Sequence, residues 1–176
     1  MKSKAVNRSA LAVEGGRDDT AVVRDLDKRQ AALAGHLVDV EAAAPLVKAR
    51  LEERDSQVVV LPGFYGRNAA GKIQLMGRNG TDYTAACMAA ASGAGLCQIW
   101  KDVDGVRTAD PRLVPGARPI RAMSYRELRE LAYMGATVLH EEAIFPVRAA
   151  GIPVNIRDTN HPEHPGTLIV PGDRAE

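Results

Sequence analysis

A charged loop follows a short, mostly apolar segment near the middle of the chain. Residues 96–100 have the composition of a buried strand, and a polar loop begins directly after them. Ligand sites in α/β proteins lie beyond the carboxyl ends of strands, so this loop is a candidate site. Its carboxylates could orient a ribose hydroxyl, a magnesium ion or a lysine, and Arg112 could bind a phosphate. Alternatively, the loop is solvated and its charges pair with one another. The candidate binding residues are Lys101, Asp102, Asp104, Gly105, Arg107, Asp110 and Arg112.

A second candidate site spans residues 77–84. Two glycines in this segment allow backbone N–H groups to approach a ligand closely, and Arg78 could bind a carboxylate through two hydrogen bonds. Thr81 is expected as the N-cap of a helix with Asp82 in its first turn, which adds a positive dipole end. These features could hold a carboxylate or a phosphate. A tight turn with a helix cap and a surface arginine accounts for the same residues.

The composition limits the classes of protein to consider. The 176 residues suit one domain, and 45% hydrophobic residues support a packed core. A formal net charge of +1 gives no electrostatic reason to expect nucleic acid or a membrane as the main partner. Cys87 and Cys97 form no Cys-x-x-Cys pair, so we interpret them as buried thiols in a reducing compartment. The apolar segments are too short for a signal peptide or a membrane span, and we expect a soluble cytoplasmic protein.

The histidines do not suggest a metal centre. His161 and His164 stand in a proline-rich segment without the spacing of metal ligands. His140 lies in an apolar stretch that we interpret as helical, so we expect it to be a packed structural histidine and not an acid or base. The sequence therefore predicts no protein-bound metal.

The candidate sites must be positioned by alternating strands and helices. Apolar runs predict strands at 58–61, 72–76, 96–100, 153–157 and 167–170, the first buried on both faces and the second part of a hairpin. Helical spacing predicts helices with Pro45 in the first turn, from Thr81 to about Ser92, after Ser124 to about Met134, and over 138–147. Ser124 and Glu127 form a capping box. This alternation predicts an α/β fold with a mostly parallel sheet and helices on both faces.

Several motifs occur in the order found in one family. Residues 62–68, 77–85, 99–112, 131–140, 151–154 and 165–169 together resemble the catalytic domain of the aspartokinases, in the amino-acid kinase family. The resemblance runs from about Val58 to Val170, so we divide the chain into a poorly matched N-terminal segment, residues 1–38, and an aspartokinase-like nucleotide-binding domain, residues 39–176. It implies nucleotide contacts at the loop residues above and at Thr137 and Val138, and substrate contacts at Arg78, Thr81 and Asp82; it assigns no catalytic residue.

The departures from this family cluster at functional positions. The Lys-Phe-Gly-Gly segment that cradles the transferred phosphate has no counterpart before Val58, so the N-terminal part of the catalytic domain is expected to be missing. Lys101 replaces a threonine, Arg107 an adenine-contacting tyrosine, and Thr137 a phosphate-contacting lysine. Losing one charged phosphate contact would weaken binding by about tenfold to a hundredfold. Lys101 could reach the phosphates in place of the lysine absent at position 137, and Arg107 could stack on a base.

The resemblance implies a function, and its departures leave alternatives. Aspartokinases transfer the γ-phosphoryl group of MgATP to the side-chain carboxylate of L-aspartate, toward lysine, threonine and methionine. We expect this activity to be incomplete or impaired in this chain alone. The alternatives are a catalytically silent paralogue or fragment that binds nucleotide or a partner, and an amino-acid kinase for another acidic substrate. A sheet without its first strands should expose apolar surface, so we also expect a homo-oligomer or a partner subunit.

Overall fold

The computed structural model describes residues 6–7, 38–53, 58–67, 72–76, 79–134 and 138–172. Most of the N-terminal segment, together with Arg78 and Thr137, lies outside the described residues. The helices are α2 (Val40–Glu52), α3 (Gly80–Ser92), α4 (Tyr125–Tyr133) and α5 (Glu141–Ala149), and the strands are β1 (Val6–Asn7), β2 (Tyr65–Arg67), β3 (Ile73–Leu75), β4 (Cys97–Lys101), β5 (Ala122–Ser124), β6 (Val154–Asp158) and β7 (Thr167–Val170). No helix in these ranges combines the length and apolar character needed to cross a bilayer.

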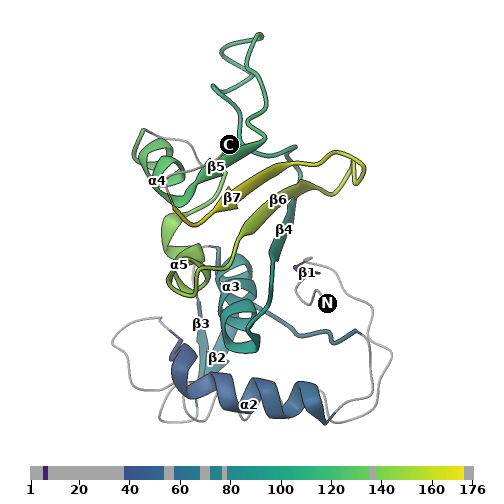
Figure 1. Ribbon diagram of the computed structural model, residues 1–176, viewed down its shortest axis with the longest axis vertical. Coiled ribbons are helices and arrows are strands. Elements are labelled where there is room, and N and C mark those ends of the chain that lie inside the picture. The colour runs from purple at the N-terminus through teal and green to yellow at the C-terminus, as the bar shows by residue number, and fades with distance from the viewer. Residues whose placement is uncertain are drawn as a thin grey trace.

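A five-stranded sheet organises the fold, in the order β1-β4-β6-β7-β5 (Figure 1). The pairs β1–β4, β4–β6 and β5–β7 are parallel, and β6–β7 is antiparallel. The predicted α/β class with a mostly parallel sheet is confirmed. The strands expected at 96–100 and 153–157 each begin and end one residue later, and the strand at 167–170 is found as predicted.

The hydrophobic core lies between one face of the sheet and the helices. The register places Cys97 and Ile99 beside Val154 and Ile156, and these side chains are fully buried. Alanines on the buried face of α3 allow that helix to pack closely against the sheet, and α3 in turn packs against α2 and α5. Cys87 and Cys97 are free buried thiols, as predicted, and burial raises the pKa of each to about 12.

Local signals located several element ends correctly. The Ser124 hydroxyl accepts the Glu127 N–H, and the Glu127 carboxylate accepts the Ser124 N–H, so the predicted capping box starts α4. Gly93 ends α3 in the left-handed conformation, with φ +66. The predicted hairpin is present as the antiparallel pair β2–β3, although its turn at 68–71 is outside the described residues.

The predicted strand at 58–61 is wrong. These residues form no strand, and the Val58 side chain is 75% exposed. In the described structure, β1 occupies the position beside β4 in the sheet. Residues 58–61 therefore cannot pair with that edge of β4. Of these four residues, only Leu61 packs against the small hydrophobic cluster formed by α2 and α3.

Two helix starts also differ from expectation. Asp39 caps α2, its side chain accepting the Ala42 N–H at 2.9 Å, so Pro45 lies inside the helix and not in its first turn.

Helix α5 begins at Glu141, which leaves Val138 and Leu139 in the preceding segment. His140 is the N-cap residue of α5 and is exposed, so the prediction of a packed histidine is wrong. The neighbouring Leu139 is buried instead, with 2% of its surface exposed.

The capping box yields a stability prediction. Ser124→Ala removes the hydroxyl that accepts the Glu127 N–H, and we expect the free energy of unfolding to fall by about 1 kcal/mol. Urea denaturation would measure the change. Ser92→Ala is the matched control, because the Ser92 hydroxyl only donates to a carbonyl in the last turn of α3. Equal effects of the two substitutions would contradict a capping role for Ser124.

Candidate functional site

The first turn of α3 is held by close backbone approach. Asn79 adopts the left-handed conformation, with φ 60, and Gly80 follows it so tightly that a Cβ there would lie 2.9 Å from the Met76 Cβ. Thr84 accepts the Phe64 N–H at 3.1 Å and donates to the Gly80 carbonyl at 2.7 Å. Because asparagine tolerates the left-handed region, the helix starts earlier than expected. The N-cap is therefore Asn79 and not Thr81.

An ion pair joins the two candidate sites. Asp82 lies in the first turn of α3, as predicted, and its side chain is 9% exposed. Lys101 is the last residue of β4, and its Nζ lies 2.8 Å from the Asp82 Oδ2. The segments carrying the predicted substrate residues and the predicted nucleotide residues therefore meet at this contact.

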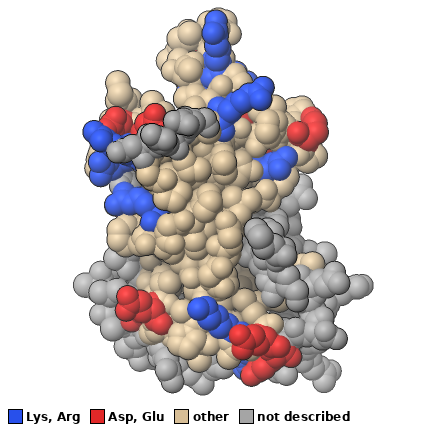
Figure 2. All heavy atoms as spheres, in the orientation of Figure 1, with Lys and Arg blue, Asp and Glu red and all other residues tan. Residues whose placement is uncertain are grey.

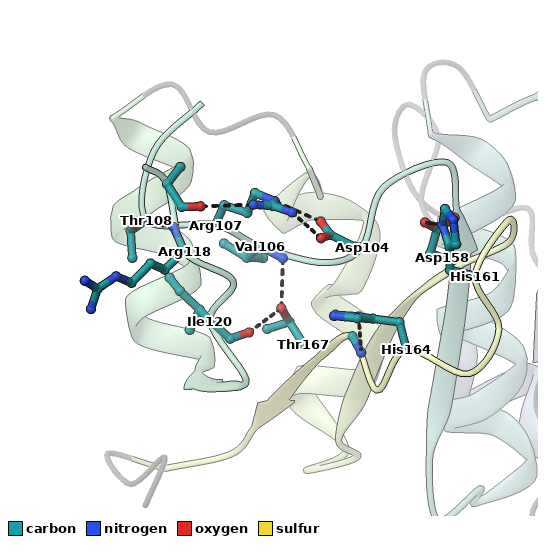
Figure 3. Close-up of polar contacts among 12 residues, drawn as sticks. Asp104, Val106, Arg107, Thr108, Arg118, Ile120, Asp158, His161, His164 and Thr167 are labelled. Atoms are coloured by element: carbon teal, nitrogen blue, oxygen red, sulfur yellow. Dashed lines mark hydrogen bonds and ion pairs between the residues drawn. The ribbon is translucent and has the colours of Figure 1, made fainter. Parts of the chain in front are cut away.

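Within the loop after β4, residues 107–119 form an arm that projects from the sheet (Figure 1). At its base, the buried Thr167 hydroxyl accepts the Val106 N–H at 2.8 Å and donates to the Ile120 carbonyl at 2.6 Å (Figure 3). Gly105, with φ +118, packs directly on this residue, since a Cβ there would lie 2.4 Å from the Thr167 Oγ1. Gly105 therefore has a structural reason to be glycine.

Two arginines of the loop, Arg107 and Arg112, are bound to carboxylates of the same loop. Arg107 donates to Asp104 through Nε and Nη2 and to the Ala117 carbonyl through Nη1. The Arg107 guanidinium holds the pKa of the Asp104 carboxyl below its usual range. Arg112 pairs with Asp110 at 2.7 Å and is 88% exposed. These pairs correspond to the alternative in which the charges of the loop satisfy one another. In Figure 2, basic side chains lie on the projecting arm among uncharged residues.

The loop between β6 and β7 lies against the same edge of the sheet. Its Thr159 N–H donates to the Lys101 carbonyl at 2.7 Å. Arg157 lies over the Trp100 ring, 5.0 Å from its centroid, and donates to the carbonyls of Pro162 and His164. The Arg157 guanidinium therefore holds the β6–β7 loop beside Trp100.

Asp158 is a residue of this edge that the sequence analysis did not select. It pairs in register with Lys101 on the neighbouring parallel strand and is 5% exposed. Its carboxylate accepts the Asn160 N–H and contacts the His161 Nδ1 at 2.8 Å. The hydrogen bond to Asp158 raises the pKa of the His161 imidazole above its ordinary value. The rule that selected Lys101, a polar run directly after a strand, would also have selected Asp158.

The structure thus brings together part of the predicted site. Lys101, Asp102 and Asp82 lie where β4 ends beside the first turn of α3, whereas Asp110 and Arg112 belong to the arm. Val138 packs against the core cluster, and Arg78 and Thr137 are outside the described residues. Within the described ranges, no three His, Cys, Asp or Glu side chains are arranged to hold a metal ion.

Comparison with known proteins identifies the family. The model of the amino acid kinase family matches residues 8–158, and the chain belongs to that family. Its similar relatives include aspartokinases. The bifunctional aspartokinase/homoserine dehydrogenase of Haemophilus influenzae is 46% identical over 145 residues, which are 81% of this chain and 18% of that protein.

Solved aspartate kinases share the fold as well as the sequence pattern. The enzyme from Clostridium acetobutylicum is 42% identical with a TM-score of 0.73, over 85% of this chain and 34% of that one. E. coli aspartokinase III in complex with aspartate and ADP is 34% identical with a TM-score of 0.73, over 87% and 34%. The predicted resemblance to aspartokinases is confirmed. The chain spans about a third of the length of these solved chains and 18% of the length of the Haemophilus influenzae protein.

The contact between Gly105 and Thr167 yields a second stability prediction. Gly105→Ala would force a side chain into the left-handed region and against a buried hydroxyl, so we expect a loss of more than about 1 kcal/mol in the free energy of unfolding. Gly116→Ala is the control, because a Cβ at Gly116 meets nothing within 4 Å and its effect should stay within about 0.5 kcal/mol. Thermal denaturation of both variants measures the difference, and similar losses would show that the Thr167 contact is unimportant.

The His161–Asp158 contact predicts a pH dependence. Because the pKa of His161 is raised in the folded chain, its stabilising contribution is fully present below the unfolded pKa of about 6.5 and is lost as pH rises through the folded pKa. NMR titration should place the His161 midpoint above that value, and Asp158→Asn should lower it. Glu163→Gln, the control, should change the midpoint less, because Glu163 acts on His161 only through space. An unchanged midpoint in Asp158→Asn would refute the assignment.

Proposed function

We propose that this chain belongs to an aspartate kinase and contributes the part of the site that binds nucleotide and the acidic substrate. The observation that carries this is the Lys101–Asp82 contact, which joins the β4 loop to the start of α3. Further support comes from the similarity to E. coli aspartokinase III, whose structure holds aspartate and ADP. Activity, substrate and partners are part of the proposal, since the chain spans 34% of that relative.

The proposed contacts follow the two segments. L-aspartate would bind at the start of α3, where an arginine can hold a carboxylate through two hydrogen bonds. ATP would bind along the loop after β4 and the segment before α5. Mg²⁺ would arrive on the phosphates of the nucleotide, as is usual for this ion. The proposed substrate residues are Arg78, Thr81 and Asp82, and the proposed nucleotide residues are Lys101, Asp102, Gly105, Arg107, Asp110, Arg112, Thr137 and Val138.

The chemistry requires placement more than covalent participation by the protein. An oxygen of the aspartate side-chain carboxylate attacks the γ-phosphorus of ATP, and the bond from that phosphorus to the β–γ bridging oxygen breaks. The products are β-aspartyl phosphate and ADP, and the protein transfers no proton. The protein must align the two anions and neutralise their charge. Such a product serves lysine, threonine and methionine synthesis, and the free buried thiols Cys87 and Cys97 fit a reducing cytoplasm.

A second candidate function is binding without turnover. The observation that favours it is the pairing of Arg107 with Asp104 and of Arg112 with Asp110, which satisfies both cations without a ligand. In this case the chain would act as a nucleotide-binding or partner-binding subunit. Exposed Ile73 and Leu75 on the β2–β3 hairpin support association with a second copy or another subunit. An amino-acid kinase for a different acidic substrate is a variant of the first proposal.

Calorimetric titration with MgATP, with and without L-aspartate, tests the proposed function. We expect saturable nucleotide binding and, on adding aspartate, formation of ADP and an acyl phosphate that hydroxylamine traps. Binding without turnover would select the second function, and turnover only with another carboxylate would change the substrate. L-Asparagine is the matched control, since it lacks the attacking carboxylate. Absence of binding at millimolar nucleotide would refute both nucleotide functions.

A further inference from the structure

Arg107 and Arg112 of the loop after β4 bind groups of the loop itself. Arg107 uses three of its nitrogens on Asp104 and the Ala117 carbonyl, so it closes the base of the arm. Arg112 pairs with Asp110, two residues away, in an exposed turn. Both guanidinium groups therefore stabilise the loop that carries them and do not reach the segment of the proposed substrate site.

Lys101 reaches a different element. Its ammonium contacts Asp82, 19 residues earlier in the chain, and the two side chains are only 22% and 9% exposed. Its backbone is fixed in the β4–β6 ladder opposite Asp158, and its carbonyl accepts the Thr159 N–H. The position of the ammonium is therefore restrained both by the strand and by the carboxylate.

This ammonium lies between the two halves of the proposed site. Its Nζ contacts Asp82 in the first turn of α3, and the loop with Asp102 and Gly105 follows Lys101 directly in the chain. A phosphoryl group that passes from nucleotide to acidic substrate must lie between these segments. An ammonium carries three N–H donors, and the bond to Asp82 uses one. The charge can therefore contact a phosphate oxygen without releasing Asp82, and partial burial strengthens that attraction.

We propose that Lys101 binds the terminal phosphate of the nucleotide and that Asp82 is a positioning residue that holds its ammonium there. The inference rests on the proposed nucleotide site and assigns its phosphate-binding charge to one residue. It also gives Asp82 a role in orienting this lysine, separate from any contact with substrate. Arg107 and Arg112 can then line the proposed nucleotide site while they stay paired with Asp104 and Asp110.

Comparing MgATP with adenosine tests the proposal, because only MgATP carries phosphates. In Lys101→Met, MgATP affinity should fall by about tenfold to a hundredfold while adenosine affinity stays unchanged. Lys101→Arg should keep most of the preference for MgATP. Lys48→Met is the matched control, since Lys48 is an exposed lysine on α2, and it should leave both affinities unchanged.

The outcomes separate this inference from the proposed function. An unchanged MgATP affinity in Lys101→Met, or equal losses for MgATP and adenosine, would overturn the role of Lys101 while leaving nucleotide binding intact. A wild-type chain that binds neither compound would overturn the nucleotide site itself and the inference with it. If Lys101→Met does not fold, the double variant Lys101→Met with Asp82→Asn removes both charges, which avoids a buried unpaired carboxylate. The double variant should show the same selective loss of MgATP affinity.

Discussion

The parallel pairing of β4 with β6 is the constraint on which the rest of this structure depends. Its register runs from Cys97 beside Val154 to Lys101 beside Asp158. Because parallel strands point the same way, the loops that follow them leave from the same edge of the sheet. A shift of the register by one residue would place Lys101 opposite a different neighbour and turn side chains to the wrong face. The buried side chains of Ile99 and Ile156 oppose such a shift.

Polar groups at this edge serve two different purposes. Thr167 is fully buried, and its hydroxyl both accepts and donates a hydrogen bond, so it fixes the arm without leaving an unsatisfied group. Arg107 extends the same function to the base of the arm. Lys101, in contrast, forms an ion pair with Asp82 on a different element, helix α3. The distinction between charges that stabilise a loop and charges that link two segments separates structural from functional candidates.

Family membership and local chemistry provide complementary information. The order of motifs places the chain in the amino acid kinase family and beside the aspartokinases. Within this fold, the structure shows that Lys101 pairs with Asp82 and that Arg107 pairs with Asp104. The shared fold therefore accounts for the arrangement of the backbone, and the individual side chains account for the contacts at this edge of the sheet.

Local signals in the sequence determined much of the fold. The Ser124–Glu127 capping box, the Gly93 helix end and the strand at 167–170 depend on residues close in the chain, so each was predictable. The strand expected at 58–61 and the packed His140 failed because burial and strand pairing are settled by distant neighbours. Only the tertiary structure decided that Lys101 meets Asp82 and that Thr167 meets Val106, 61 residues away. The sequence shows which residues are charged and how they are spaced. Their partners depend on strand order and register, which bring distant segments together.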